Sequence, residues 1–200
     1  QFDVLIGRGI EHPNGDKTTV RGTSHYFGSV AVSSGHVMSS GAHYAEFQIT
    51  GVPWIGIVRP MPNLDASAYA RSYCCFVGEP DLYPVFLAQR SDRWGDSNVC
   101  ACQYQCENGY LSWTDWDEAN GDDNEYYWEG MEGCRTGDTV GMLLNLDEGT
   151  LTVYKNNLRL GVMKDGLSGS YCWYVTVADG SGLGREQEAV SIQRGTLLPL

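Results

Sequence analysis

Residues 137–151, with the sequence Gly-Asp-Thr-Val-Gly-Met-Leu-Leu-Asn-Leu-Asp-Glu-Gly-Thr-Leu, contain the pattern that decides the fold. A strand with alternating Val140, Met142 and Leu144 ends at an Asp-Glu-Gly turn, and a second strand follows over residues 150–154. Asn156-Asn157 then reverses the chain, because Asn tolerates the positive φ that tight hairpin turns require. A third strand returns over residues 158–163. The stretch therefore predicts three consecutive antiparallel strands.

Similar short strands recur on both sides of this stretch, and helical periodicity is nearly absent. In residues 43–49 the alternation should turn Ala45, Phe47 and Ile49 inward. The other predicted strands cover residues 30–32, 54–58, 139–146, 173–177 and 189–192. The expected core consists of Phe47, Ile49, Trp54, Ile57, Val140, Met142, Leu144, Leu151, Val153, Leu160, Val175 and Val177.

Size and composition agree with one all-β domain. The 200 residues include 42% apolar residues and 25 Gly, enough to fill a core between many turns. We predict a two-layer antiparallel β-sandwich with two long loops. Residues 60–80 form one, with a helical turn over residues 66–71, and the acidic residues 115–125 form the other.

The order of these motifs resembles the SPRY (B30.2-like) family. The three strands and two turns of residues 137–163 appear in the family's order, continued by Gly166-Leu167. Upstream, residues 33–36, 41–47 and 54–58 resemble the family's earlier strands, so the resemblance covers about residues 29–192 without the two long loops. It implies a curved antiparallel sandwich that binds proteins or peptides through its inter-strand loops and performs no catalysis.

The sequence departs from the family pattern at two points. Residues 1–28 do not match the PRY element that precedes SPRY in longer B30.2 domains, and Asn145 stands where Asp is commoner. We therefore expect an N-terminal extension over residues 1–28 that packs on a SPRY-like sandwich over residues 29–200.

The net charge of −12 limits the classes of partner. Nucleic acid and anionic membranes favour basic proteins, so neither is expected as a partner. No run of 18 apolar residues is present, which argues against membrane insertion. From Glu107 to Glu132 inclusive, the chain has nine acidic residues and no Lys or Arg. A partner of basic character is the better match.

Neither a cofactor nor a metal site is predicted. Asp115, Asp117, Asp122 and Asp123 carry the oxygen ligands that calcium prefers, but their spacing is not that of an EF-hand. Cys100 and Cys102 are too closely spaced for a typical zinc pair. The seven cysteines, an odd number, are interpreted as buried, reduced side chains. With no Asn-x-Ser/Thr sequon either, an intracellular location is weakly favoured.

No catalytic residue is predicted. The four histidines lack a recognisable nucleophile motif, and the glycines of residues 180–184 lack the Lys-Ser/Thr of a phosphate-binding loop.

The predicted binding face combines three loops. Exposed aromatic and basic side chains dominate many interfaces, and acidic neighbours would attract a basic partner. The late loop is included because, by resemblance, the corresponding loop of SPRY proteins helps to bind peptides. The candidate residues are Tyr69, Arg71, Tyr73, Asp115, Trp116, Asp117, Asp122, Asp123, Asp179 and Gly180.

Three functions follow from the sequence. The first is recognition of a protein or peptide, as the resemblance implies. Lectin-like glycan binding is the second, because aromatic rings beside carboxylates suit sugars. The third is a structural role in which the acidic loop docks a basic neighbour. Alternatively, Trp113 and Trp128 belong to the core, the acidic residues only solvate a long loop, and Arg71 pairs with that loop internally.

Overall fold

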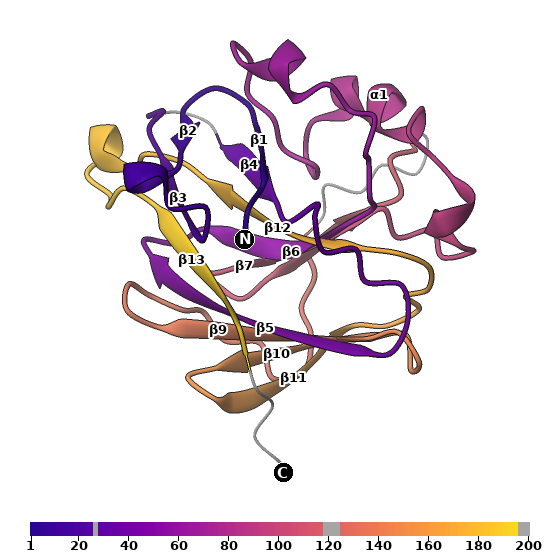
Figure 1. Cartoon of the computed structure of the whole chain (residues 1–200). Helices are drawn as coiled ribbons and strands as arrows, with labels where there is room; N and C mark the ends of the chain where they lie inside the picture. The colour runs from indigo at the N-terminus through magenta and orange to yellow at the C-terminus, as the bar shows by residue number, and fades with distance from the viewer. Residues whose placement is uncertain (26–27, 118–124, 196–200) are drawn as a thin grey trace.

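Two antiparallel sheets face one another and hold the main core between them (Figure 1). The computed structural model describes residues 1–25, 28–117 and 125–195. The strand order is β1-β4-β12-β6-β7-β8 in the six-stranded sheet and β11-β10-β9-β5-β13-β3-β2 in the seven-stranded sheet. The predicted fold class, an all-β two-layer sandwich, is confirmed.

The six-stranded sheet contains β1 (Val4–Ile6), β4 (Ser29–Val32), β6 (Trp54–Val58), β7 (Ala101–Gln105), β8 (Leu111–Thr114) and β12 (Cys172–Val177). The seven-stranded sheet contains β2 (Ile10–Glu11), β3 (Thr19–Gly22), β5 (Ala42–Thr50), β9 (Thr139–Asn145), β10 (Thr150–Lys155), β11 (Leu158–Lys164) and β13 (Ala189–Arg194).

Helical structure is short. The α-helix α1 (Tyr83–Leu87) lies within the long connection from β6 to β7. The 3-10 helices are η1 (Pro13–Gly15), η2 (Ala66–Tyr69), η3 (Pro80–Leu82), η4 (Asp92–Trp94) and η5 (Ser181–Leu183). Among the described residues, no helix is long and apolar enough to cross a membrane.

The alternation in β5 places its apolar side chains between the sheets. Ala45, Phe47 and Ile49 are buried, as predicted, and Phe47 packs edge-on against Trp173 with ring centroids 6.0 Å apart. Ten of the twelve predicted core residues are buried, whereas Trp54 and Leu160 are half-buried.

The turn between β10 and β11 follows the predicted chemistry. Asn156 and Asn157 both have positive φ, 50° and 67°, which is the left-handed conformation that a tight primed hairpin turn requires. Strands β9, β10 and β11 are consecutive neighbours, as residues 137–163 predicted.

Residues 1–22 contribute strands to both sheets. β1 pairs with β4 at one edge, and β3 pairs with β13 in the other sheet. The N-terminal segment thus extends the sandwich, and a domain boundary at residue 28 remains a prediction.

Candidate functional site

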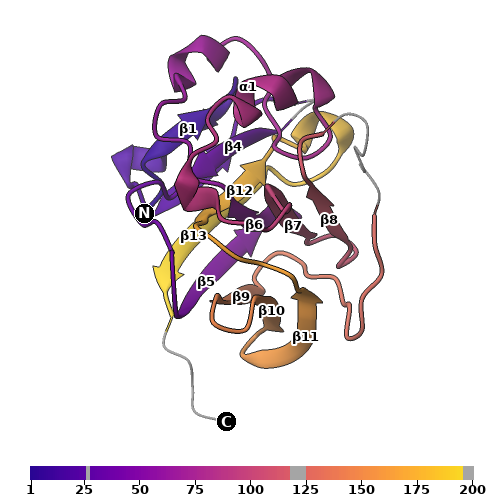
Figure 2. The same ribbon diagram turned by 90° about the vertical axis from the view of Figure 1, so that its right-hand side faces the viewer.

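Residues 59–100 cover the outer face of the six-stranded sheet, away from the other sheet (Figure 2). Their apolar side chains form a second core with the outward-facing side chains of β4, β12 and β7. Phe76, Phe86 and Trp94 are buried there, with the rings of Phe76 and Phe86 5.2 Å apart. The long segment predicted as a loop over residues 60–80 is therefore the start of a packed cover, and its predicted helical turn is η2.

Trp116 lies in this second core, not on the surface. Its side chain is 1% exposed, and its indole Nε1–H donates a hydrogen bond of 2.8 Å to the carbonyl of Phe76. The ring centroids of Phe86 and Trp94 lie 5.0 and 5.7 Å from that of Trp116. The prediction of an exposed aromatic anchor at Trp116 is wrong, because burial of a large ring outweighs the acidic character of its neighbours.

The backbone of Trp116 has φ 58°, which is rare for a bulky residue. Two short bonds support the turn: the Trp116 N–H donates to Thr114 Oγ1, and the Asp117 N–H donates to Asp115 Oδ1, each at 2.9 Å. The turn directs the indole inward and leaves Asp117 exposed and Asp115 half-buried. The predicted binding residues Asp122 and Asp123 lie outside the described residues.

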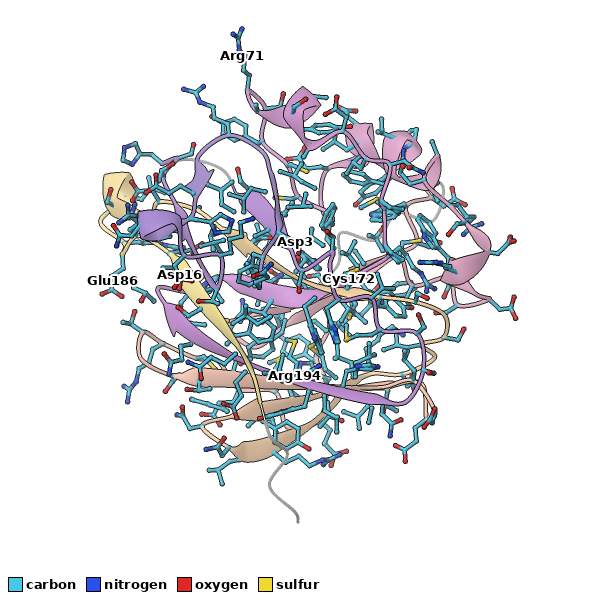
Figure 3. The ribbon with its side chains drawn as sticks, viewed as in Figure 1. Asp3, Asp16, Arg71, Cys172, Glu186 and Arg194 are labelled. Atoms are coloured by element: carbon cyan, nitrogen blue, oxygen red, sulfur yellow. The ribbon has the colours of Figure 1, made fainter. Side chains whose placement is uncertain are left out.

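Tyr69, Arg71 and Tyr73 follow η2 on the covering segment. The Asp65 carboxylate begins η2 by accepting the N–H of Ser67 at 3.0 Å. Tyr69 and Tyr73 are half-buried, and burial raises the pKa of Tyr69. The Arg71 side chain is exposed and extends away from the body of the molecule (Figure 3). Of these three side chains, Arg71 is the most accessible to a partner.

Asp179 organises the turn after β12 and is only 8% exposed. Its carboxylate accepts the N–H of Ser181 at 2.9 Å and lies 3.3 Å from His25 Nδ1. The pKa of Asp179 is lowered, first by the Ser181 backbone bond. Gly180 is half-buried. Asp179 thus stabilises a turn and offers little surface of its own.

Hydrogen bonds connect two of the predicted loops to one another, and the first and the late loop to the N-terminal segment, at one end of the sandwich. The covering segment contacts Trp116 through Phe76, and the Cys74 N–H donates to the Gly28 carbonyl at 3.4 Å. The Asp179 N–H donates to the Ser24 carbonyl at 2.8 Å. In Figure 1, however, η5 beside Asp179 and α1 of the covering segment lie on opposite sides of this end. The late turn is therefore peripheral to the surface around Arg71.

A cavity of about 550 Å³ lies where the cover stands away from β1, β4 and β12. Residues 1–28 were not assigned strands from the sequence, so this cavity was not predicted. The pairing of hydrophobic Val4 and Ile6 on one face of a short strand was the available signal. Its lining is mostly apolar and comprises Val4, Ile6, Val32, Ser34, Val37, Arg59, Pro60, Met61, Pro62, Leu64, Ser91, Asp92, Arg93 and Cys172.

All seven cysteines are unbonded, and all except half-buried Cys75 are buried. Burial raises the pKa of the Cys102 and Cys172 thiols to about 12. Within the described ranges, no group of three or more His, Cys, Asp or Glu side chains is placed to hold a metal ion.

His25, Asp179 and Ser181 lie together but lack the geometry of a catalytic relay. Asp179 Oδ2 and Ser181 Oγ both face the same ring nitrogen of His25, Nδ1, at 3.3 and 3.5 Å. A relay needs the acid and the nucleophile on opposite nitrogens of the imidazole. The cluster is better explained as support for the turn.

These features define a class of protein: a loop-rich antiparallel β-sandwich with a packed cover on one outer face. Solved structures identify the fold more closely. The chain is similar to the SPRY domain of human HERC1, with 14% identity, a TM-score of 0.54, and 88% of this chain and 87% of that chain covered. It is also similar to a human SPRY domain, with 17% identity, a TM-score of 0.50 and coverage of 95% and 99%.

The TRIM65 PSpry domain is a third similar structure, with 14% identity, a TM-score of 0.53 and coverage of 95% and 86%. The chain has the SPRY fold, as the resemblance of residues 137–163 predicted. No protein-family model matches the sequence, and no curated protein matches it.

Proposed function

We propose that this protein is a non-enzymatic binding module that recognises a protein or peptide through the end of the sandwich around Arg71. The single observation that supports this function most is the SPRY fold, because SPRY domains in general are protein-interaction modules. The covering segment, residues 59–100, supports this location of the binding site. Its apolar side chains pack on the six-stranded sheet, while the Arg71 side chain is exposed to solvent. A rigid base with an exposed basic side chain is well suited to binding.

A partner of basic character is the second element of the proposal. Asp117 is exposed and Asp115 half-buried at the border of the cover, and the chain carries a net charge of −12. Acidic groups at the rim of an interface mainly accelerate association with a basic partner, an effect that salt weakens. The proposed surface leaves out buried Trp116 and consists of Tyr69, Arg71, Tyr73, Asp115, Asp117, Asp122 and Asp123, with Asp179 and Gly180 at its periphery.

The test uses a binder selected from a peptide library against the intact chain. Association rates are measured at low and high salt for a quadruple variant, Asp115→Asn, Asp117→Asn, Asp122→Asn and Asp123→Asn. The matched control removes four acidic charges elsewhere, all at exposed residues, with Glu11→Gln, Glu129→Gln, Glu148→Gln and Asp165→Asn. We expect slower, less salt-dependent association for the first variant only. Equal behaviour of the two variants would remove these acidic residues from the site.

Glycan binding is a second candidate because one aromatic pair, of half-buried Tyr110 and exposed Tyr127, lies at the surface. Tyr127 is 76% exposed, its hydroxyl lies 2.8 Å from that of Tyr110, and their ring centroids are 4.9 Å apart. Such rings can stack on sugars. A glycan array that shows no binding, or binding unchanged by Tyr127→Ala, would contradict this candidate.

A further inference from the structure

A smaller cavity of about 230 Å³ opens between the two sheets. Arg194, at the end of β13, lines it and is labelled in Figure 3. It lies apart from the proposed protein-binding end, because its walls come from β5, β12, β13 and the connection between β4 and β5. The lining residues are Gln1, Ser33, His36, Tyr44, Ala45, Trp173, Ile192, Gln193 and Arg194.

Basic side chains gather at this cavity although the protein is strongly acidic. Arg194 and His36 line it, and the His43 ring packs edge-on against that of His36 with centroids 5.6 Å apart. Arg194 is exposed, and neither it nor His36 has a side-chain hydrogen bond or an ion pair within the described part of the chain. Positive groups that approach one another without an acidic partner repel, unless an anion lies among them.

The neighbouring carboxylates have other partners. Glu46 accepts a hydrogen bond of 3.3 Å from the Tyr44 hydroxyl. Asp3 accepts bonds from the Ser34 hydroxyl and, at 3.1 Å, from the Gly35 N–H. The pKa of His36 is lowered, first by burial and then by the positive charges of His43 and Arg194. Positive charge thus dominates the surroundings of His36.

We propose that this cavity binds a small tetrahedral oxyanion, a phosphate or sulfate group, between the Arg194 guanidinium and the His36 imidazole. The planar guanidinium provides paired N–H donors that match two oxygens of such an anion. Ser33, Tyr44 and Gln193 line the same space and carry further hydrogen-bonding groups. A water molecule occupies about 30 Å³ in the liquid, so the cavity has room for one such group with a few waters.

Because His36 is a titratable group at the cavity, the affinity for an oxyanion should depend on pH. An anion favours the protonated imidazole of His36, so affinity should fall as pH rises through the histidine range. The other titratable or charged groups near His36 are His43, Arg194, Tyr44, Glu46 and Asp3. Sulfate remains doubly charged near neutral pH, so the pH dependence of its binding reports on the protein.

The experiment is a sulfate titration of the intact chain at constant ionic strength, with chloride as the balancing anion. The ring proton signals of His36 are followed by nuclear magnetic resonance near pH 5.5 and near pH 7.5. We expect a saturable shift of His36 and weaker binding at the higher pH. A change in the His36 signals that does not saturate, an adventitious ion only, would overturn the proposal.

Two variants test the role of Arg194. Arg194→Gln should weaken binding by about tenfold or more, because it removes the positive charge together with the paired N–H donors. Arg194→Lys keeps the charge without the paired donors and should bind more weakly than the parent. The matched control Arg159→Gln removes one exposed positive charge from β11 and should change affinity by less than about twofold. Equal losses in Arg194→Gln and Arg159→Gln would contradict the site.

A further comparison distinguishes the source of the anion. Inorganic phosphate and a phosphoserine peptide are titrated in the same way. Similar affinities would identify the free ion as the ligand, whereas binding of the peptide at least about tenfold more tightly would identify a phosphorylated molecule. If neither inorganic phosphate nor the phosphoserine peptide produced a saturable shift of the His36 signals, the proposal would be overturned.

Discussion

At the scale of single residues, Glu188 is an acidic side chain whose surroundings favour its neutral form. It borders a cavity of about 300 Å³ together with Glu107 and Arg185, and its Oε2 accepts the Ala178 N–H at 2.8 Å. Burial raises the pKa of Glu188 to about 7 and outweighs the lowering by the Ala178 bond and by Arg185. The neutral acid is therefore favoured by folding.

The stability of the protein should depend on pH through Glu188. Because the folded pKa is raised from 4.5 to about 7, its contribution is fully present below about pH 4.5 and is lost as pH rises through 7. Glu188→Gln should therefore raise the free energy of unfolding at pH 8 by about 1–3 kcal/mol, since one pKa unit corresponds to about 1.4 kcal/mol. Urea unfolding at pH 5 and pH 8 measures this, with exposed Glu148→Gln as the control. The prediction would be contradicted if the free energy of unfolding changed between pH 5 and pH 8 by the same amount in Glu188→Gln as in the parent protein.

Leu144 tests the phase of the central strand β9. Its side chain is fully buried between the sheets. Leu144→Ala should lower the free energy of unfolding by about 2–5 kcal/mol, because the cavity left behind is not refilled. Leu158→Ala, at a side chain that is 72% exposed, should change it by less than about 0.5 kcal/mol. Chemical denaturation of both variants measures the difference, and similar values would show that the burial of β9 is misassigned.

Trp116 should act through stability rather than through partner contact. Trp116→Phe removes the donor that satisfies the buried Phe76 carbonyl, at a cost of about 1–3 kcal/mol. The thermal midpoint should fall while the affinity of any partner for the folded protein stays unchanged. If Trp116→Phe had normal stability but weakened binding, Trp116 would instead contact the partner directly.

The sequence could not reveal the burial of Trp116. The charged neighbours Asp115 and Asp117 predict that this stretch is exposed to solvent. The aromatic rings that enclose Trp116 belong to Phe76, Phe86 and Trp94, which lie at least 22 residues away in the chain. Arg71 was predicted to be available to a partner, and its side chain is exposed. Exposure on a solvated loop is a local property, whereas burial beneath a distant segment is not.

At the scale of elements, alternation predicted the strands that have one buried face. Strand β5 shows it most clearly, with Ala45, Phe47 and Ile49 inward. Strand β7 was not delimited, because all five of its residues are buried, with one face against the main core and the other under the cover. The polar residues Gln103 and Gln105 are buried as well, so their alternation with Cys102 and Tyr104 does not separate a buried face from an exposed one. Strand β1 has only the pair Val4 and Ile6 as a signal, and β2 has only two residues, so alternation is too short to distinguish either strand from a loop.

The hairpin between β10 and β11 provides a test at this scale. Asn157 has φ 67° and is exposed, so its backbone conformation matters more than its packing. Asn157→Val should lower the free energy of unfolding by about 1–2 kcal/mol, because a β-branched residue tolerates the left-handed region poorly. Asn157→Gly should retain stability within about 0.5 kcal/mol. Denaturation curves in which the two variants coincide would contradict the left-handed turn.

At the scale of the whole molecule, the packed cover and the sandwich together protect the cysteines. Six of the seven are buried, and burial raises the pKa of half-buried Cys75 to about 12 as well. A thiol-specific disulfide reagent at pH 8 should therefore modify the native protein at least about 100-fold more slowly than the urea-unfolded protein. All seven thiols should react after unfolding. Rapid modification of several thiols in the native state would show that the cover opens readily.

Strand β13 joins parts of the chain that are far apart in sequence. It lies between β5 and β3, so residues 189–194 hold residues 19–22 in the seven-stranded sheet. During synthesis on the ribosome, β3 and β5 are therefore made before β13, the strand that lies between them and pairs with both. Each then presents an open edge of the kind that recruits strands from other chains. A nascent chain remains open to such mispairing until residues 189–194 have left the exit tunnel, so chaperones that shield strand edges should matter most for this protein late in its synthesis.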